Sequence, residues 1–342
     1  MVATEVIKEK KKPTAFKVSF ICSILVGLIF LFSIYSLSVG STDYGFFDII
    51  DILKGEGSRS AEIIIINLRL PRMILGLIVG ASLSVSGALL QSVMRNPLAD
   101  PGSIGVSAGA GTAAITILLL FPDLSASVPI FAFIGAGLAC ILIYSMAWNG
   151  GINPVRLILS GVAINSVLGA YNSLLQLMNS DNLQGVLSFM NGSLAGRSWD
   201  QVKIALVYGS VGLVLGFCCI KLANLLQLGD EMAKSLGTNV SKSRILLSAV
   251  SAFLAAATVS VVGMIGFVGL VVPHVSRMIV GSDYKALLPV STLLGALTLV
   301  IADTIGRTIV PGVEIPVGII MAVSGGPFFL YMLKKGGKVY GN

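Results

Sequence analysis

Residues 86–110 of the sequence read SGALLQSVMRNPLADPGSIGVSAGA and place a polar segment with two prolines between two apolar runs. A proline ring restricts φ and removes a backbone donor, so the helix that enters this stretch is predicted to end near Asn96. Gly102 and Gly105 then allow a second helix to begin close to a neighbour. In a bilayer, such a break forms a loop at the membrane surface or lines a path for a solute.

The composition around this stretch predicts a membrane protein. The chain has 342 residues, of which 55% are hydrophobic and 11% are charged, and its mean hydropathy is +0.93. Soluble domains contain about 25% charged residues, so this chain lacks the polar side chains to cover a water-facing surface. The 23 Lys and Arg exceed the 16 Asp and Glu, and they cluster at the ends of apolar runs. That placement indicates membrane orientation and not nucleic-acid binding.

Apolar runs long enough to cross a bilayer, about 20 residues each, recur along the chain. Residues 18–39 form the first, which follows a basic segment and is longer than the core of a signal peptide. The others lie at residues 73–93, 104–121, 130–148, 156–178, 202–222, 245–266, 287–309 and 315–333, with a half-length run at 268–280. These ten passes predict an all-α polytopic membrane protein.

The charge distribution orients these ten passes. With both ends in the cytoplasm, 16 Lys and Arg residues fall inside and 7 fall outside, as the positive-inside rule requires. A single transmembrane domain, residues 18–335, then lies between cytoplasmic tails at residues 1–17 and 336–342. Residues 40–67 carry several acids and are long enough for a short helix on the outer surface.

Small residues spaced four apart predict close helix packing. The pairs are Gly76 and Gly80, Gly105 and Gly109, and Gly212 and Gly216. Helices in lipid approach closely at such positions, so we interpret most of these glycines as packing residues.

Residues 223–244, ANLLQLGDEMAKSLGTNVSKSR, are too polar to span the membrane. Gly229 and Gly237 divide them into two predicted short helices. The apolar stripe of this segment consists of Leu225, Leu226, Leu228, Met232 and Leu236. An amphipathic pair of helices in the cytoplasm either lies on the membrane surface or docks a partner, and the composition does not choose between the two.

The sole histidine, His274, lies in a second polar break at residues 263–283. It could act as a ligand or a proton carrier, but a packed residue that bonds a freed carbonyl is the commoner case. The sequence near it offers no second histidine or carboxylate to complete a metal site. The four cysteines lie in apolar runs without ligand spacing, so we predict no bound metal.

Several tracts, in order, resemble the FecCD-type permeases, the membrane subunits of ABC importers for ferric siderophores, haem and cobalamin. The tracts are RLPR at residues 69–72, GASLSVSGALLQSVMRNPLADPGSIGVSAGA at 80–110, GMIGFVGLVVPHVSR at 263–277, and ADTIGR followed by EIPVGIIMAVSGGPFF. The resemblance extends from about residue 69 to the C-terminus. It implies a fold like that of cobalamin-importer permeases, with ten helices in each subunit.

The resemblance also implies partners. Permeases of this family work as pairs, identical or paralogous, with the substrate path between the two subunits. Two ATPase subunits bind on the cytoplasmic side, and an extracytoplasmic substrate-binding protein delivers the cargo. The chain itself is expected to bind no cofactor, because it lacks the G-x-x-x-x-G-K-[ST] motif; ATP and Mg would be held by the ATPase.

Site residues follow from the same resemblance. Residues 96–98 would narrow the cytoplasmic end of the path, beside a loop at residues 150–154. This predicted gate consists of Asn96, Pro97, Leu98, Asn153 and Pro154. The short helices at residues 223–244 would be the ATPase-coupling element, which favours docking over a surface helix. The predicted coupling residues are Leu225, Leu228, Gly229, Met232, Leu236 and Gly237.

Three outer arginines, Arg69, Arg72 and Arg307, are predicted by the resemblance to dock acidic residues of the binding protein. Guanidinium groups suit this task because they bind carboxylates in a two-pronged manner. Simpler interpretations stay open. Arg69 and Arg72 could anchor a helix at the interface, and Arg307 could pair with Asp303 four residues earlier on the same helix.

Two other function classes fit the sequence less well. Residues 105–109 match G-x-S-x-G, the nucleophile elbow of hydrolases, but that motif requires a strand-to-helix turn, whereas here it opens a transmembrane helix. An ion-driven secondary transporter would need carboxylates at mid-membrane, and the one acid within a predicted span, Asp303, lies near its outer end. We therefore predict a non-enzymatic permease of the bacterial cytoplasmic membrane that imports a ferric siderophore, with cobalamin or haem as alternatives.

Overall fold

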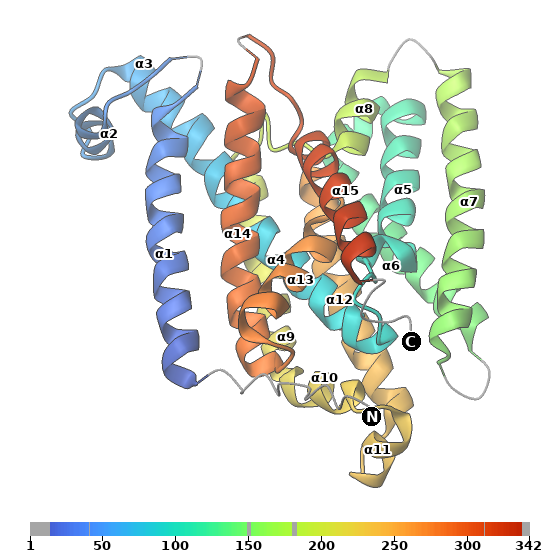
Figure 1. Cartoon of the computed structure of the whole chain (residues 1–342). Helices are drawn as coiled ribbons and strands as arrows, with labels where there is room; N and C mark the ends of the chain where they lie inside the picture. The colour runs from blue at the N-terminus through green and yellow to red at the C-terminus, as the bar shows by residue number, and fades with distance from the viewer. Residues whose placement is uncertain (1–13, 41, 149–151, 180–182, 311, 337–342) are drawn as a thin grey trace.

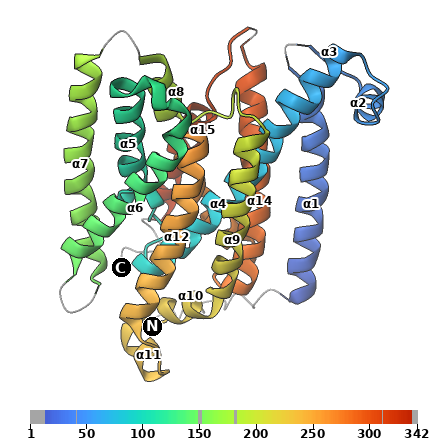
Figure 2. The same ribbon diagram turned by 180° about the vertical axis from the view of Figure 1, so that it is seen from behind.

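The computed structural model describes residues 14–40, 42–148, 152–179, 183–310 and 312–336. Within these ranges the chain forms helices and loops, with one isolated bridge between Trp148 and Ile152. Figures 1 and 2 show α1 (Ala15–Ser38) at one edge of the helical bundle and α7 (Pro154–Met178) at the other. Most of the two predicted tails lies outside the described residues.

The described helices confirm the predicted all-α polytopic fold. Seven are long and apolar enough to cross a membrane, and three shorter apolar segments accompany them. Besides α1 and α7, the long ones are α4 (Leu70–Met94), α6 (Val128–Ala147), α9 (Trp199–Cys218), α12 (Val240–Val262) and α14 (Tyr284–Thr308). The shorter ones are α5 (Val106–Leu120), α13 (Val268–Val280) and α15 (Val317–Gly336). Each predicted run corresponds to one of these ten helices.

The two ends of the bundle differ. At one end lie α2 (Phe46–Leu53), which is the predicted short helix of residues 40–67, and α3 (Arg59–Glu62). At the other end lie α10 (Ile220–Gln227) and α11 (Asp230–Ser235), the two predicted short helices. We call the first the outer end and the second the inner end, because the basic residues favour a cytoplasmic location for the α10–α11 side.

One local prediction was wrong, and one short helix was not predicted. The helix predicted from residue 73 begins at Arg59, because α3, the π-helical segment η1 (Ile63–Arg69) and α4 run on without a break. Pro71 does not open this helix; the wide turns of η1, in which the Leu70 N–H bonds the Ile65 carbonyl, accommodate its ring. A further short helix, α8 (Leu183–Asn191), lies in a stretch where none was predicted.

Helix α4 is the centre of the bundle. Of the 18 most apolar consecutive residues in the continuous helix Arg59–Met94, 78% are buried, against 6% in α1. Helix α4 packs against α9, α12, α13 and α14. A Cβ built on Gly80 would lie 2.2 Å from the Gly295 carbonyl oxygen of α14, and one on Gly295 would lie 2.3 Å from the Gly80 carbonyl oxygen. Only glycine permits this approach, which confirms Gly80 as a packing residue.

The chain leaves helical geometry between α12 and α13, and backbone hydrogen bonds satisfy the freed groups. The Met264 N–H donates to the Phe189 carbonyl at the end of α8, and the Ser193 N–H donates to the Val262 carbonyl at the end of α12. Each unpaired backbone group costs roughly several kcal/mol in a bilayer. Because these hydrogen bonds satisfy the freed groups, the half-length helix α13 can lie inside the bundle.

Candidate functional site

At the outer end, Arg72 forms a buried ion-pair network. Its Nε and Nη2 donate to the Asp303 carboxylate at 2.9–3.1 Å, and its Nη1 donates to Glu314 Oε2 at 2.8 Å. The Arg307 Nε lies 3.4 Å from the same Asp303 carboxylate, as the four-residue spacing predicted. Both Arg72 and Asp303 are buried, so water screens this pair only weakly.

Arg69 has backbone partners instead. Its guanidinium donates to the carbonyls of Leu37 and Ser38 at the end of α1 and of Thr42 in the connection to α2, and it lies over the Tyr44 ring. Arg69 is 6% exposed and Arg72 is 8% exposed, so neither guanidinium extends freely from the surface. The three arginines predicted to dock the binding protein are therefore brought together, and docking by them stays a prediction.

These arginines line a cavity of about 770 Å³ at the outer end. Arg197, in the loop before α9, also lines it, and its Nε donates to the Ser193 carbonyl. Burial lowers the pKa of the Arg197 guanidinium from its ordinary value, because the charged form loses water. Asp43 and Glu314 add negative charge to the same wall. Sequence reasoning missed Arg197 because no recognised tract contains it.

At the inner end, the polar stretch of residues 95–105 turns the chain from α4 to α5. Helix α4 ends at Met94, close to the predicted position, and Arg95 adopts the left-handed conformation with φ of 49°. The Asn96 Oδ1 accepts the Leu98 N–H at 2.9 Å, which fixes the turn, and the Leu98 side chain is 37% exposed. The structure therefore places Leu98 on the molecular surface at the inner end, and its role in a gate stays a prediction.

Pro97 lies in the same turn as Asn96 and Leu98, and the other two predicted gate residues, Asn153 and Pro154, lie at the start of α7. The Asn153 Oδ1 accepts the Val155 N–H at 2.9 Å, so Asn153 caps the helix, and Pro154 is its first residue. Asn165, further along α7, donates to the Gly102 carbonyl at 3.2 Å. The two loops are thus connected through α7, although residues 149–151 lie outside the described residues.

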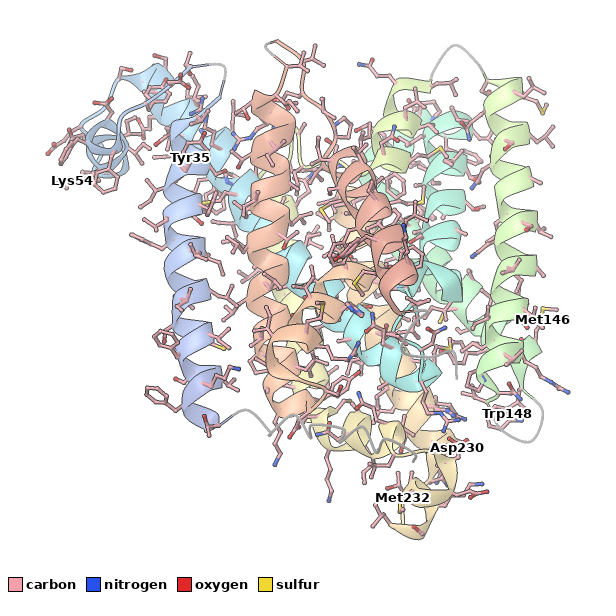
Figure 3. The ribbon with its side chains drawn as sticks, in the orientation of Figure 1. Tyr35, Lys54, Met146, Trp148, Asp230 and Met232 are labelled. Atoms are coloured by element: carbon pink, nitrogen blue, oxygen red, sulfur yellow. The ribbon has the colours of Figure 1, made fainter. Side chains whose placement is uncertain are left out.

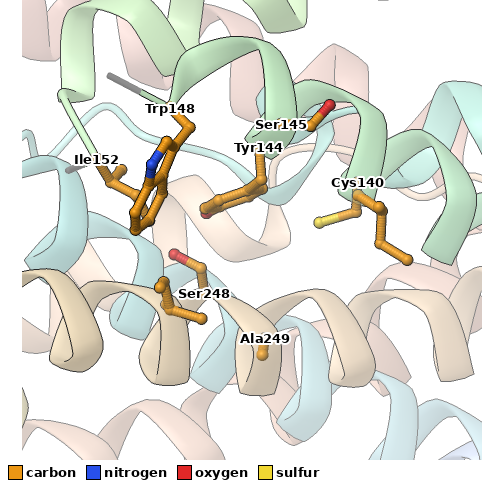
Figure 4. Close-up of a pocket in the computed structure, with 9 residues that line it drawn as sticks. Cys140, Tyr144, Ser145, Trp148, Ile152, Ser248 and Ala249 are labelled. Atoms are coloured by element: carbon orange, nitrogen blue, oxygen red, sulfur yellow. The ribbon is translucent and has the colours of Figure 1, made fainter. Parts of the chain in front are cut away.

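Next to the second loop lies an apolar cavity of about 330 Å³ between α6 and α12. Figure 4 shows Trp148 and Ile152 over Ser248, with Tyr144 and Cys140 further along α6. Ile152 is buried and forms an isolated bridge with Trp148. Both residues line the cavity on the side opposite Ser248 of α12.

Three of the six predicted coupling residues form an exposed apolar patch, whereas Leu225 is half-buried. Leu228, Met232 and Leu236 are 58%, 55% and 56% exposed, and we call them the α10–α11 patch. Figure 3 shows Met232 at the inner extremity of the molecule. In contrast, Leu226 of the same apolar stripe is buried against the bundle. One part of the stripe therefore packs against the protein, and the other part is exposed. Leucine and methionine side chains exposed in this way, outside the apolar spans, are typical of a docking surface.

A model of the FecCD transport family matches residues 25–335 of the chain. The chain belongs to the FecCD transport family. The match confirms the resemblance seen in the sequence tracts and covers all ten apolar helices except the start of α1 and the last residue of α15.

Relatives of this FecCD permease agree over most of its length. The ferric citrate import system permease YfmD of Bacillus subtilis is 41% identical over 314 residues, 92% of this chain and 94% of that protein. The cobalamin import system permease BtuC of Halobacterium salinarum is 43% identical over 277 residues, which are 81% of this chain and 74% of that protein. A solved structure of a metal-chelate type ABC transporter, in an inward-facing conformation, has a TM-score of 0.83 at 29% identity and covers 93% of this chain and 99% of that one.

The FecCD permease is therefore a multi-pass protein of the cytoplasmic membrane. It belongs to the class of ABC importer permeases for iron chelates, haem or cobalamin. The family is one of transport permease subunits.

Proposed function

We propose that this permease imports a ferric siderophore as the membrane subunit of an ABC importer. The observation that carries the proposal is the match to the ferric citrate permease, which extends over 92% of this chain. The cobalamin permease is similar in identity but matches 81% of the chain, so cobalamin is the second candidate.

The proposed assembly has two permease subunits, two ATPases and an external binding protein. Helix α7 supports a path between the two permeases, because it stands at an edge of the bundle and exposes small residues along its middle, among larger apolar ones such as Val162, Val167 and Leu174. The exposed small residues are Ala163, Ser166, Gly169, Ala170 and Ser173. The Ser166 and Ser173 hydroxyls donate within the helix, so such a face would pass a bulky solute without holding it.

The proposed mechanism is alternating access. ATP, held with Mg on the ATPase subunits, would draw those subunits together, and the α10–α11 patch would follow the ATPase surface. The shift would reach the inner loops and α7 and change which end of the path is open. At the outer end, the arginine-lined cavity would receive carboxylates of the binding protein, which steer its approach.

Truncating the proposed gate should uncouple transport from ATP use. Leu98→Ala removes about three methyl-sized groups. Because Leu98 is 37% exposed here, closing the gate would bury about a third of their surface, roughly 1 kcal/mol, so ATP hydrolysed per cargo molecule should rise about five-fold. The measurement is ATP hydrolysis against uptake in proteoliposomes. Cysteines placed at Asn96 of both subunits, with the native cysteines replaced, should crosslink differently with and without nucleotide; no difference would exclude the gate.

The cargo proposal is tested in cells that lack this chain. Uptake of ferric citrate, a ferric hydroxamate, haem and cobalamin is measured with and without the restored gene. We expect uptake of at least one ferric chelate to depend on the permease, while haem and cobalamin uptake is unchanged. Dependence of cobalamin uptake alone would show that the siderophore proposal is wrong and the second candidate is right.

A further inference from the structure

Asp230, the first residue of α11, connects the α10–α11 patch to the rest of the bundle. Its Oδ1 lies 2.9 Å from Nη2 of Arg244 in α12 and 3.7 Å from Nη1 of Arg95 at the end of α4. Figure 3 shows Asp230 at the inner end, close to Met232 of the patch. One carboxylate on the helix that carries the patch therefore contacts two other elements.

The contact with Arg244 continues to α7. The Arg244 side chain is 5% exposed, and its second prong, Nη1, donates to the Ile152 carbonyl at 3.0 Å. Ile152 is buried beside Trp148 in the wall of the apolar cavity and precedes Pro154, the first residue of α7, by two positions (Figure 4). Because Arg244 holds Asp230 and Ile152 with one rigid guanidinium, a shift of α11 alters the support of the loop before α7.

The contact with Arg95 leads to α7 by a second route. Arg95 begins the loop that contains Asn96 and Leu98, and this loop is bonded to Asn165 of α7 through the Gly102 carbonyl. The Arg95 side chain is 44% exposed and its separation from Asp230 is 3.7 Å, so water and salt screen this pair. Of the two routes, the buried Arg244 pair is the stronger.

The geometry of α11 makes these contacts decisive for its position. The helix has six residues and lies between Gly229 and Gly237, whose φ values of 97° and 76° are in the left-handed region. Its buried residue is Ala233, which offers a single methyl group to the bundle. So small an apolar contact holds α11 weakly, and the charged contacts of Asp230 determine how it is oriented.

We propose that Asp230 is a positioning residue that transmits movement of α11 to α7 and the inner gate loop, through Arg244 and Ile152 and, more weakly, through Arg95. The inference rests on the proposed docking of the ATPase at the α10–α11 patch. It adds a specific route for the signal, in which the patch binds the ATPase and Asp230 passes the displacement on.

The test uses the complete importer in proteoliposomes and compares Asp230→Asn with Glu231→Gln. Glu231 is the exposed neighbouring acid on α11, so this control removes a charge of the same sign and leaves the Asp230 contacts intact. We expect Asp230→Asn to bind the ATPase as the unchanged protein does. Cargo moved per ATP should fall about ten-fold, within the usual range of coupling factors, and the nucleotide-dependent crosslinking at position 96 should disappear.

Two further variants separate transmission from folding. Asp230→Glu restores the charge and should recover at least part of the cargo moved per ATP. Arg244→Lys keeps a positive charge but replaces the two-pronged guanidinium with a single ammonium, so it should uncouple as Asp230→Asn does. A third variant, Arg95→Asn, is used if Asp230→Asn reduces the amount of folded permease. It tests the second route, because asparagine tolerates the left-handed backbone at this position. We expect it to reduce the cargo moved per ATP by less than the ten-fold expected of Asp230→Asn.

The outcomes that overturn the proposal differ from those that overturn the docking of the ATPase. Unchanged cargo per ATP and unchanged crosslinking in Asp230→Asn would show that the signal takes another route. Loss of ATPase binding in Asp230→Asn would place Asp230 in the docking surface and not in transmission. Failure of the ATPase to be released by substitutions in the α10–α11 patch would refute the docking site itself.

Discussion

Replacing both Met232 and Leu236 with aspartate is expected to abolish cargo-stimulated ATP hydrolysis while the permease still folds and inserts. Both side chains are more than half exposed, so the change leaves the packed bundle intact. Apolar side chains at the centre of an interface each contribute about 2 kcal/mol, and a buried aspartate there would add a desolvation cost. ATPase affinity should therefore fall about 100-fold or more. The measurement is co-purification of the ATPase together with its hydrolysis rate.

The matched control keeps the patch apolar. Met232→Leu with Leu236→Met retains the volume and hydrophobicity of both positions and should leave ATPase binding within a few-fold of the original. Normal coupling in the aspartate variant would contradict the docking assignment.

A bulky residue at Gly237 should also uncouple the importer, but Gly237 has a φ of 76°, so a side chain there strains the turn before α12 as well.

The sequence predicted the helices well because long apolar runs leave few alternatives in a bilayer. Each of the ten predicted runs became a helix, and Gly229 and Gly237 separate α11 from its neighbours as expected. The short helix α8 was missed because nine residues of mixed polarity give no spanning signal. The extended start of α4 was missed because Pro71 usually marks the beginning of a helix, and a π-helical segment that absorbs it has no sequence signature.

The contacts within the candidate sites were less predictable. Arg307 and Asp303 lie four residues apart on one helix, so their pairing could be anticipated. Arg72 lies 231 residues from Asp303, and no local pattern relates the two. Arg244 counted only as a basic residue that orients the membrane protein, although it holds Asp230 and Ile152 in place. A single sequence reveals periodicity and breaks, whereas pairs distant along the chain depend on the tertiary packing.

Removing the carboxylate of Asp303 is expected to destabilise the permease strongly. Asp303→Ala leaves Arg72 and Arg307 without the anion that both contact, and the Arg72 and Asp303 side chains are 10% and 5% exposed. Breaking a buried ion pair on one side costs about 3–5 kcal/mol, a large share of the stability of most proteins. Thermal unfolding of the purified permease in detergent should therefore shift strongly to lower temperature. Glu314→Gln is the matched control, because Glu314 is 55% exposed and its pair with Arg72 contributes about 1 kcal/mol at most.

The same variant separates two roles for the outer arginines. If they are structural, Asp303→Ala lowers stability, and charge reversal at Arg72 does the same because a glutamate would then face Asp303. If their main role is docking, Asp303→Ala would leave a stable permease whose freed guanidinium groups bind the binding protein more tightly. The increase in affinity should be clearest at low salt, because exposed charges are screened beyond about 8 Å at physiological ionic strength. Arg197→Gln completes the comparison: Arg197 lines the same cavity and lies outside the Asp303 network. A loss of binding-protein association there, without a change in thermal stability, would assign docking to the cavity while the Arg72–Asp303 pair holds the helices together.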